Sequence, residues 1–138
     1  MNYLTKSSNE TKNIAAEIAL RYKDHGGVIL LTGELGSGKT TFTQGFAKAL
    51  GIDQKIISPT FVLIRQHEIS TEKTLFHIDL YRMNENTDSK EIGLAEMAQN
   101  PNNIILIEWP ERLTKLPENC LTVEIKIVSP MEREIRVV

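Results

Sequence analysis

The feature that most constrains this chain is the segment Gly33-Glu-Leu-Gly-Ser-Gly-Lys39-Thr40, which matches the pattern G-x-x-x-x-G-K-[ST] completely. Phosphate oxygens bind to successive backbone N–H groups, so the backbone must curl tightly around them, and glycines permit that close approach. Lys39 would place a positive charge against the β- and γ-phosphates, and the Thr40 hydroxyl would bind Mg²⁺. The segment therefore predicts a site for a nucleoside triphosphate together with Mg²⁺.

The residues on either side of this loop have the pattern that the motif requires. Residues 28–31 are continuously apolar, which is typical of a strand covered on both faces. Residues 40–50 carry apolar side chains at helical spacing, and Gly51 follows where a helix terminator is expected. In the order strand, loop, helix, the first amides and the dipole of the helix point at the bound phosphates.

Further segments complete an α/β pattern. A capping box at residues 7–10 opens a helix, and residues 91–97 predict a second, short helix. Strands are predicted at 56–57, 61–64, 74–79 and 104–107, and alternation predicts an antiparallel pair at 121–127 and 135–137. We expect an α/β fold: a single P-loop NTPase-like domain over residues 1–138, with a mixed central sheet flanked by helices and a C-terminal antiparallel hairpin.

Composition and charge limit the kinds of partner and metal that we expect for this chain. The 16 basic and 18 acidic residues give a net charge of −2 without a basic run, so direct nucleic-acid binding is not indicated. The longest apolar stretch is far too short to span a bilayer, and we expect a cytoplasmic protein without a membrane partner. The single cysteine and three histidines form no ligand cluster, so we predict no zinc. His67 is expected on a strand surface.

A P-loop enzyme needs a carboxylate near Mg²⁺ at the end of a neighbouring buried strand. Glu108 follows the apolar run 104–107 and has that position, although Asp is the usual residue there. Asp79 is the other candidate, because His77 and Asp79 share one face of an alternating strand. From the residues alone, Glu108 could instead be an exposed strand end, and Asp79 could pair with Arg82.

Two more residues are candidates. Thr60, in Ser58-Pro59-Thr60, lies after the loop helix, where a threonine hydroxyl could sense the γ-phosphate or Mg²⁺. A turn made by proline at the entry to a strand explains the same residues. Trp109 follows Glu108, and a lone tryptophan is more often part of a core or an interface than of a catalytic site.

Four motifs in this order, GELGSGKTTF, SPTF, HIDLYR and IEWPERL, resemble the TsaE (YjeE) family of small bacterial P-loop ATPases from about residue 8 to residue 136. The resemblance implies a role in making threonylcarbamoyladenosine in tRNA. The implied partners are TsaD, which transfers the threonylcarbamoyl group, and TsaB, with tRNA reached through their complex. The implied activity is ATP hydrolysis that is slow alone and drives turnover of the complex.

The resemblance also assigns residues. It implies a catalytic set of Lys39, Thr60, Asp79 and Glu108. It implies Mg²⁺ ligands at Thr40, Asp79 and Glu108. Thr11 and Arg133 are expected near the nucleotide, which completes an ATP-binding set of Thr11, Gly36, Ser37, Gly38, Lys39, Thr40, Thr41 and Arg133.

Two other functions fit the loop. A small-molecule kinase would need an acceptor site and usually an arginine-bearing lid, and the six arginines are dispersed along the chain. A nucleotide-gated binding module would bind Mg-ATP without turnover. A GTPase is less favoured, because no Asn-Lys-x-Asp motif follows the predicted metal strand.

Overall fold

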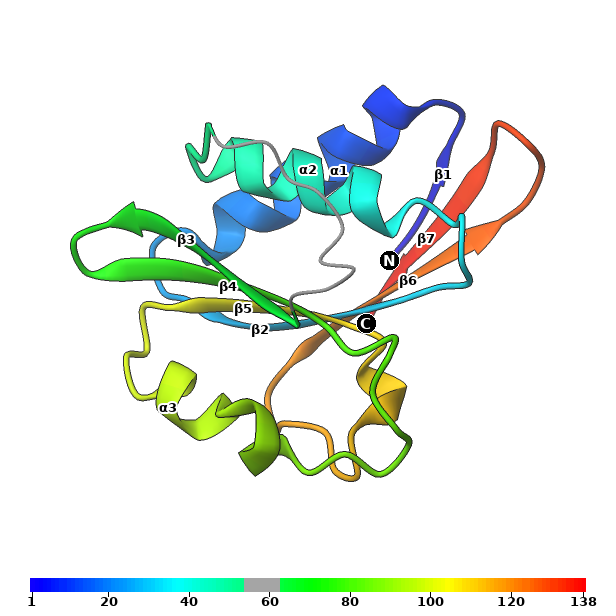
Figure 1. Ribbon diagram of the computed structural model, residues 1–138. Coiled ribbons are helices and arrows are strands. Elements are labelled where there is room, and N and C mark those ends of the chain that lie inside the picture. The colour runs from blue at the N-terminus through cyan, green and yellow to red at the C-terminus, as the bar shows by residue number, and fades with distance from the viewer. Residues whose placement is uncertain (54–62) are drawn as a thin grey trace.

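The computed structural model describes residues 1–53 and 63–138, and these residues form a seven-stranded mixed sheet with helices on both faces (Figure 1). The strands are β1 (Asn2–Thr5), β2 (Gly27–Thr32), β3 (Ile64–Ser70), β4 (Lys73–Asp79), β5 (Ile104–Glu108), β6 (Leu121–Ile127) and β7 (Arg133–Val137). The helices are α1 (Ser8–Tyr22), α2 (Lys39–Ala49) and α3 (Leu94–Ala98), with 3₁₀ turns η1 (Ser89–Ile92) and η2 (Pro110–Arg112).

The strand order is β1-β7-β6-β2-β5-β4-β3. The central strands β6, β2, β5 and β4 are parallel, whereas β3 and the C-terminal β6–β7 hairpin introduce antiparallel pairs. The carboxyl ends of the parallel strands therefore meet at one edge, which is where α/β sheets bind their ligands. The predicted α/β fold with a mixed sheet and a C-terminal hairpin is confirmed.

Two cores sandwich the sheet. Helices α1 and α2 cover one face, where Ile18, Phe42 and Phe46 pack against the sheet, and α3 lies against the other face (Figure 1). Gly45 lets α2 approach α1 closely, because a Cβ atom there would lie 2.6 Å from the Lys12 Cα atom. This contact brings the amino ends of both helices beside the loop at residues 33–38.

Helix α1 begins as the sequence predicts. The Ser7 side chain accepts a hydrogen bond from the Glu10 amide at 3.1 Å. The Glu10 carboxylate accepts from the amide of Lys6 at 3.0 Å, one residue before the position that a capping box uses. Two amide groups at the helix start are thus satisfied by side chains.

Three local features differ from the sequence predictions. Strand β1 was not predicted, and it pairs with β7 at the sheet edge. The expected helix at 91–97 is wrong in its extent, because Gly93 adopts a left-handed φ of 73° and separates η1 from α3. His67 is not on the strand surface: it is only 6% exposed, because it lies opposite Leu75 on the face covered by α1 and α2. Burial lowers its pKa, and His77 and Arg65 lower it further.

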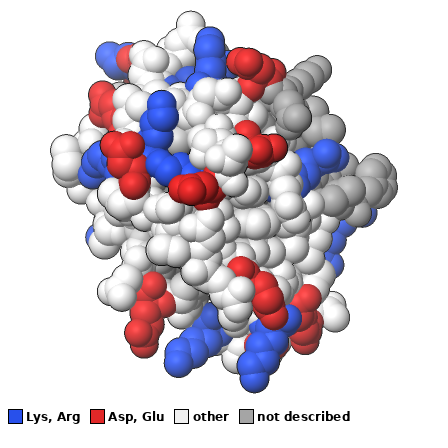
Figure 2. Space-filling model, turned by 90° about the vertical axis from the view of Figure 1, so that its left-hand side faces the viewer, with Lys and Arg blue, Asp and Glu red and all other residues white. Residues whose placement is uncertain are grey.

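On the face shown in Figure 2, acidic and basic side chains lie interspersed around a broad uncharged area. Among the described residues, the helices are all too short or too polar to traverse a lipid bilayer.

Candidate functional site

The loop at residues 33–38 curls through left-handed backbone conformations. Gly36 has φ 77° and Gly38 has φ 109°, a region that residues with a Cβ atom rarely adopt. Gly38 is also the N-cap of α2 and provides no side-chain cap, and the first turn of the helix has no acidic residue. Within the described residues, five backbone amides of the loop and the helix start have no hydrogen-bond acceptor: those of Gly36, Gly38, Lys39, Thr40 and Thr41. The arrangement is a concave set of donors suited to an anion.

Lys39 is the cation of this loop, and only 7% of it is exposed. Its Nζ atom donates to the Gly33 carbonyl and, at 3.0 Å, to the Glu34 carbonyl. Burial lowers the pKa of Lys39, while the carboxylates of Glu108, Asp79 and Glu111 oppose that shift. A partly desolvated ammonium ion beside open amide donors would be stabilised by an incoming anion.

Ser37 shows how tightly the loop is built. A Cβ atom on Gly33 would lie 2.5 Å from the Ser37 Oγ atom and 2.8 Å from the Ile125 carbonyl oxygen, so only glycine fits at position 33. The Ser37 hydroxyl is buried without a hydrogen-bond partner among the described residues. The hydroxyl therefore fills the space beside Gly33 inside the loop.

The two predicted acids lie side by side. Asp79 ends β4 and Glu108 ends β5, and the two residues are register partners in the parallel pair. Glu108 is 3% exposed, so it is not a solvated strand end. Asp79 accepts a hydrogen bond from the Tyr81 amide at 2.9 Å. Burial raises the pKa of Asp79; the Tyr81 amide lowers it and Glu108 raises it.

Glu108 has a partner that the sequence did not assign. His77 Nε2 lies 2.5 Å from Glu108 Oε2, and His77 is 1% exposed. The other ring nitrogen of His77, Nδ1, has no partner within the described residues. The tautomer with hydrogen on Nε2 therefore leaves no buried N–H unpaired, and we assign His77 as a neutral donor to the Glu108 carboxylate.

Trp109 lies at the centre of a group of cations and rings. The Lys39 Nζ atom is 4.5 Å from the indole centroid, and the Arg112 guanidinium carbon is 5.6 Å from it. The Tyr81 ring packs against the indole, with 5.1 Å between the ring centroids. Such contacts stabilise a cation over an aromatic face, so Trp109 helps to position Lys39.

Among the described residues, cavities lie on both sides of the loop, and the smaller of these, of 110 Å³, is lined by most of the residues expected near the nucleotide. Its lining includes Thr11, Ser37, Gly38, Thr41 and Arg133. Thr11 comes from α1 and Arg133 from β7, and the Thr11 hydroxyl is also 2.9 Å from the Thr5 hydroxyl. Helix amides, hydroxyl groups and a guanidinium group meet here.

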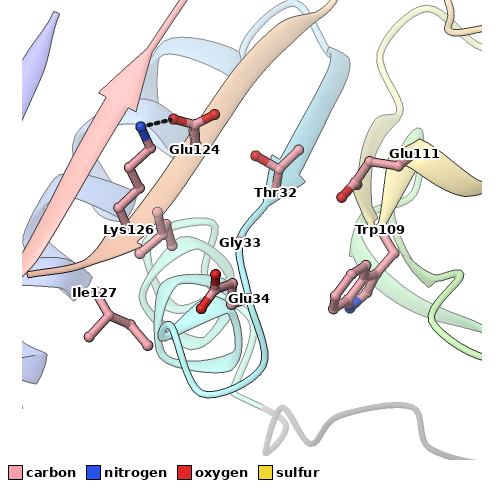
Figure 3. A pocket seen from close by; sticks show the side chains of 9 residues that line it. Thr32, Gly33, Glu34, Trp109, Glu111, Glu124, Lys126 and Ile127 are labelled. Atoms are coloured by element: carbon pink, nitrogen blue, oxygen red, sulfur yellow. Dashed lines mark ion pairs between the residues drawn. The ribbon is translucent and has the colours of Figure 1, made fainter.

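The larger cavity, of 440 Å³, lies on the other side of the loop (Figure 3). Glu124 and Lys126 of β6 line one side, Trp109 and Glu111 the other, and Glu34 lies between them. Lys126 is paired with Glu124 at 3.3 Å. Three carboxylates against one ammonium ion disfavour an anion in this cavity, so the smaller cavity is the better candidate for an anion site.

Of the remaining predicted residues, Thr40 lies beside the loop and Thr60 lies outside the described residues. Thr40 is the second residue of α2 and is half-buried, next to Lys39. Thr60, with the predicted strands at 56–57 and at the start of 61–64, lies outside the described residues. In the part of the chain that the structure describes, no group of three or more His, Cys, Asp or Glu side chains is arranged to hold a metal ion. Mg²⁺ needs only one or two carboxylates when phosphates and water complete its shell, so the Asp79–Glu108 pair would be enough to hold it beside a polyphosphate.

A glycine-rich strand–loop–helix unit at the carboxyl edge of a mainly parallel sheet defines the class of P-loop-type α/β proteins. Residues 5–135 match the family model described as "Threonylcarbamoyl adenosine biosynthesis protein TsaE". The chain belongs to the TsaE family of threonylcarbamoyl adenosine biosynthesis proteins.

Individual relatives agree with this assignment. The chain is 38% identical over 136 residues to the tRNA threonylcarbamoyladenosine biosynthesis protein TsaE of Bacillus subtilis (strain 168), covering 98% of this chain and 83% of the relative. It is 34% identical to the TsaE protein of Treponema pallidum (strain Nichols), covering 99% of each. The crystal structure of Bacillus subtilis YdiB superposes with a TM-score of 0.74 at 35% identity, covering 98% of this chain and 82% of that one.

Proposed function

We propose that this chain binds Mg-ATP at the loop of residues 33–40 and hydrolyses it as a subunit of the tRNA threonylcarbamoyladenosine modification machinery. The observation that supports this most is the set of amides of Gly36 and of Gly38 to Thr41, which have no acceptor among the described residues and lie beside the buried Lys39 ammonium group. The polyphosphate would lie against these donors and extend into the smaller cavity, where Thr11 and Thr41 offer hydroxyl groups to the nucleoside.

The residues divide the chemistry among them. Lys39 would move from the Gly33 and Glu34 carbonyls to the phosphates, which are stronger acceptors for its charge. Thr40, Asp79 and Glu108 would hold Mg²⁺ directly or through its water. Bound there, Mg²⁺ would neutralise charge that develops on the phosphates. His77 would keep the Glu108 carboxylate in one orientation throughout.

We further propose TsaD-like and TsaB-like proteins as partners, with tRNA reached through them and with cytoplasmic location. The decisive experiment measures ATP turnover by the chain alone, then with both partners, with and without tRNA. Stimulation by the partners supports the proposal. Phosphorylation of a small metabolite would favour a kinase, and binding without turnover in every mixture would favour a nucleotide-gated module.

The role of Glu108 has its own test. Replacing it with alanine should lower hydrolysis at least about tenfold while Mg-ADP affinity falls less, because the carboxylate acts at the metal and its water. Glu118→Ala, which removes an exposed carboxylate outside the site, is the matched control. Hydrolysis at the wild-type rate in Glu108→Ala would remove Glu108 from the catalytic set.

A further inference from the structure

Arg133 of β7 joins the C-terminal hairpin to the phosphate-binding loop through hydrogen bonds. Its Nε atom donates to the Ser37 carbonyl at 2.8 Å, and Nη2 donates to the Gly36 carbonyl at 3.3 Å. Its Nη1 atom donates to carbonyls of the β6–β7 turn, at 2.9 Å for Ser129 and 3.0 Å for Glu132. One guanidinium group therefore ties two segments that are almost a hundred residues apart in sequence.

The bonds to the loop fix the direction of its amides. In a trans peptide the C=O and N–H groups point in opposite directions. Holding the Ser37 carbonyl toward the hairpin therefore aims the next amide, that of Gly38, away from Arg133 and toward the concave side of the loop. Holding the Gly36 carbonyl fixes the preceding peptide in the same way, and the Ser37 amide of that peptide donates to the Glu34 carbonyl at 3.0 Å, which closes the turn of the loop.

A second contact from the hairpin supports the same loop. The Ile125 carbonyl of β6 lies so close to Gly33 that a Cβ atom there would be 2.8 Å away. The hairpin thus buttresses the loop at its start through Ile125 and near its end through Arg133. Most of the five N–H donors of Arg133 are already engaged by backbone carbonyls of the loop and of the β6–β7 turn.

We propose that Arg133 is a positioning residue, which fixes the loop so that the Gly38 amide is pre-oriented for phosphate, rather than a direct ligand of the nucleotide. The proposal rests on the proposed function for the identity of the anion, but its structural part does not. The planar fork is essential, because two carbonyls from successive residues are held at once. A lysine would keep the charge at this position but not the fork.

The test compares Arg133→Met and Arg133→Lys with the wild type, and Arg136→Met is the matched control. Arg136 lies on the same strand and is exposed to solvent. Backbone order parameters of residues 36–38 are measured by ¹⁵N relaxation in the nucleotide-free proteins. Affinities for Mg-ADP and for inorganic tripolyphosphate are measured by calorimetry. Far-UV circular dichroism establishes that each variant is folded.

Both Arg133 variants should lower the order parameters of residues 36–38 from about 0.85 to below about 0.6, whereas Arg136→Met should not. Both should weaken Mg-ADP and tripolyphosphate by the same factor, about tenfold, because the two ligands share the loop amides. Loss of Mg-ADP affinity alone, with an ordered loop, would make Arg133 a nucleoside contact and overturn the proposal. Wild-type behaviour of Arg133→Lys would overturn it as well.

Failure of the proposed function gives a different result. A wild-type chain that binds neither ligand would contradict the nucleotide site. The order parameters would still decide whether Arg133 holds the loop: a drop in both variants supports the positioning role, and an unchanged loop overturns it.

Discussion

The His77–Glu108 contact predicts a large effect of replacing His77 with leucine. Leucine has a similar volume, so little of the effect comes from a cavity. Glu108 is 3% exposed, and its carboxylate would lose its hydrogen-bond donor away from water. A hydrogen bond to a charged group contributes about 1.5–3 kcal/mol, and breaking a buried charged pair costs about 3–5 kcal/mol. Because His77 is assigned as neutral, the full cost of a broken ion pair does not apply, and we expect the middle of this span, about 2–4 kcal/mol.

The assay is equilibrium unfolding in urea. With a slope of about 2 kcal/mol per molar urea, the expected loss moves the midpoint down by about 1–2 M. His77→Gln is the matched variant, because its amide nitrogen can donate from nearly the position of Nε2, and it should recover at least half of the loss. ATP turnover should follow the same order: wild type, then glutamine, then leucine. Equal destabilisation by leucine and glutamine, or none by leucine, would refute the assigned hydrogen bond.

Three further predictions concern other parts of the site. Lys39→Met should lower ATP turnover by about 10²-fold. The free energy of unfolding should change by less than about 1 kcal/mol, because burial already disfavours the ammonium ion. Large destabilisation measured by calorimetry would contradict this. Gly45→Ala should lower the midpoint of urea unfolding. The new methyl group would clash with the Lys12 backbone at a cost of about 1–3 kcal/mol, whereas the gain in helix propensity is about 1 kcal/mol. A stabilised variant would show that α1 and α2 pack less tightly. Burial raises the pKa of Asp79, so protonation of its carboxyl group stabilises the fold below pH 3.8, and this stabilisation is lost as pH rises through the folded-state pKa. Asp79→Asn should remove this pH dependence of the free energy of unfolding. Parallel pH profiles for wild type and variant would argue against a raised pKa.

Sequence patterns predicted the parts of the fold that depend on neighbouring residues. The loop at 33–40 and its flanking strand and helix follow from glycine positions and apolar spacing within about 25 residues. Asp79 and Glu108 were each predicted at the end of a strand, but the sequence did not predict that they are register partners, and it left open whether Glu108 is buried.

Other features depend on contacts between distant residues and left little trace in local patterns. Strand β1 has only four residues and exists because β7, at the far end of the chain, pairs with it. The bond between His77 and Glu108 joins residues 31 positions apart on two different strands, and the sequence pattern did not indicate it. His67 alternates like a surface residue, yet helices α1 and α2 cover its face of the sheet. Arg133 gave no local sign that it would hold the phosphate loop.

Anion binding by the amides of Gly36 and of Gly38 to Thr41 is tested most directly by amide chemical shifts during a titration with Mg-ADP. We expect saturable shifts at Gly36 to Thr41 and at Thr11, with little change at Glu111 and Lys126 in the larger cavity. Shifts confined to the larger cavity, or no shifts at millimolar Mg-ADP, would contradict the central claim.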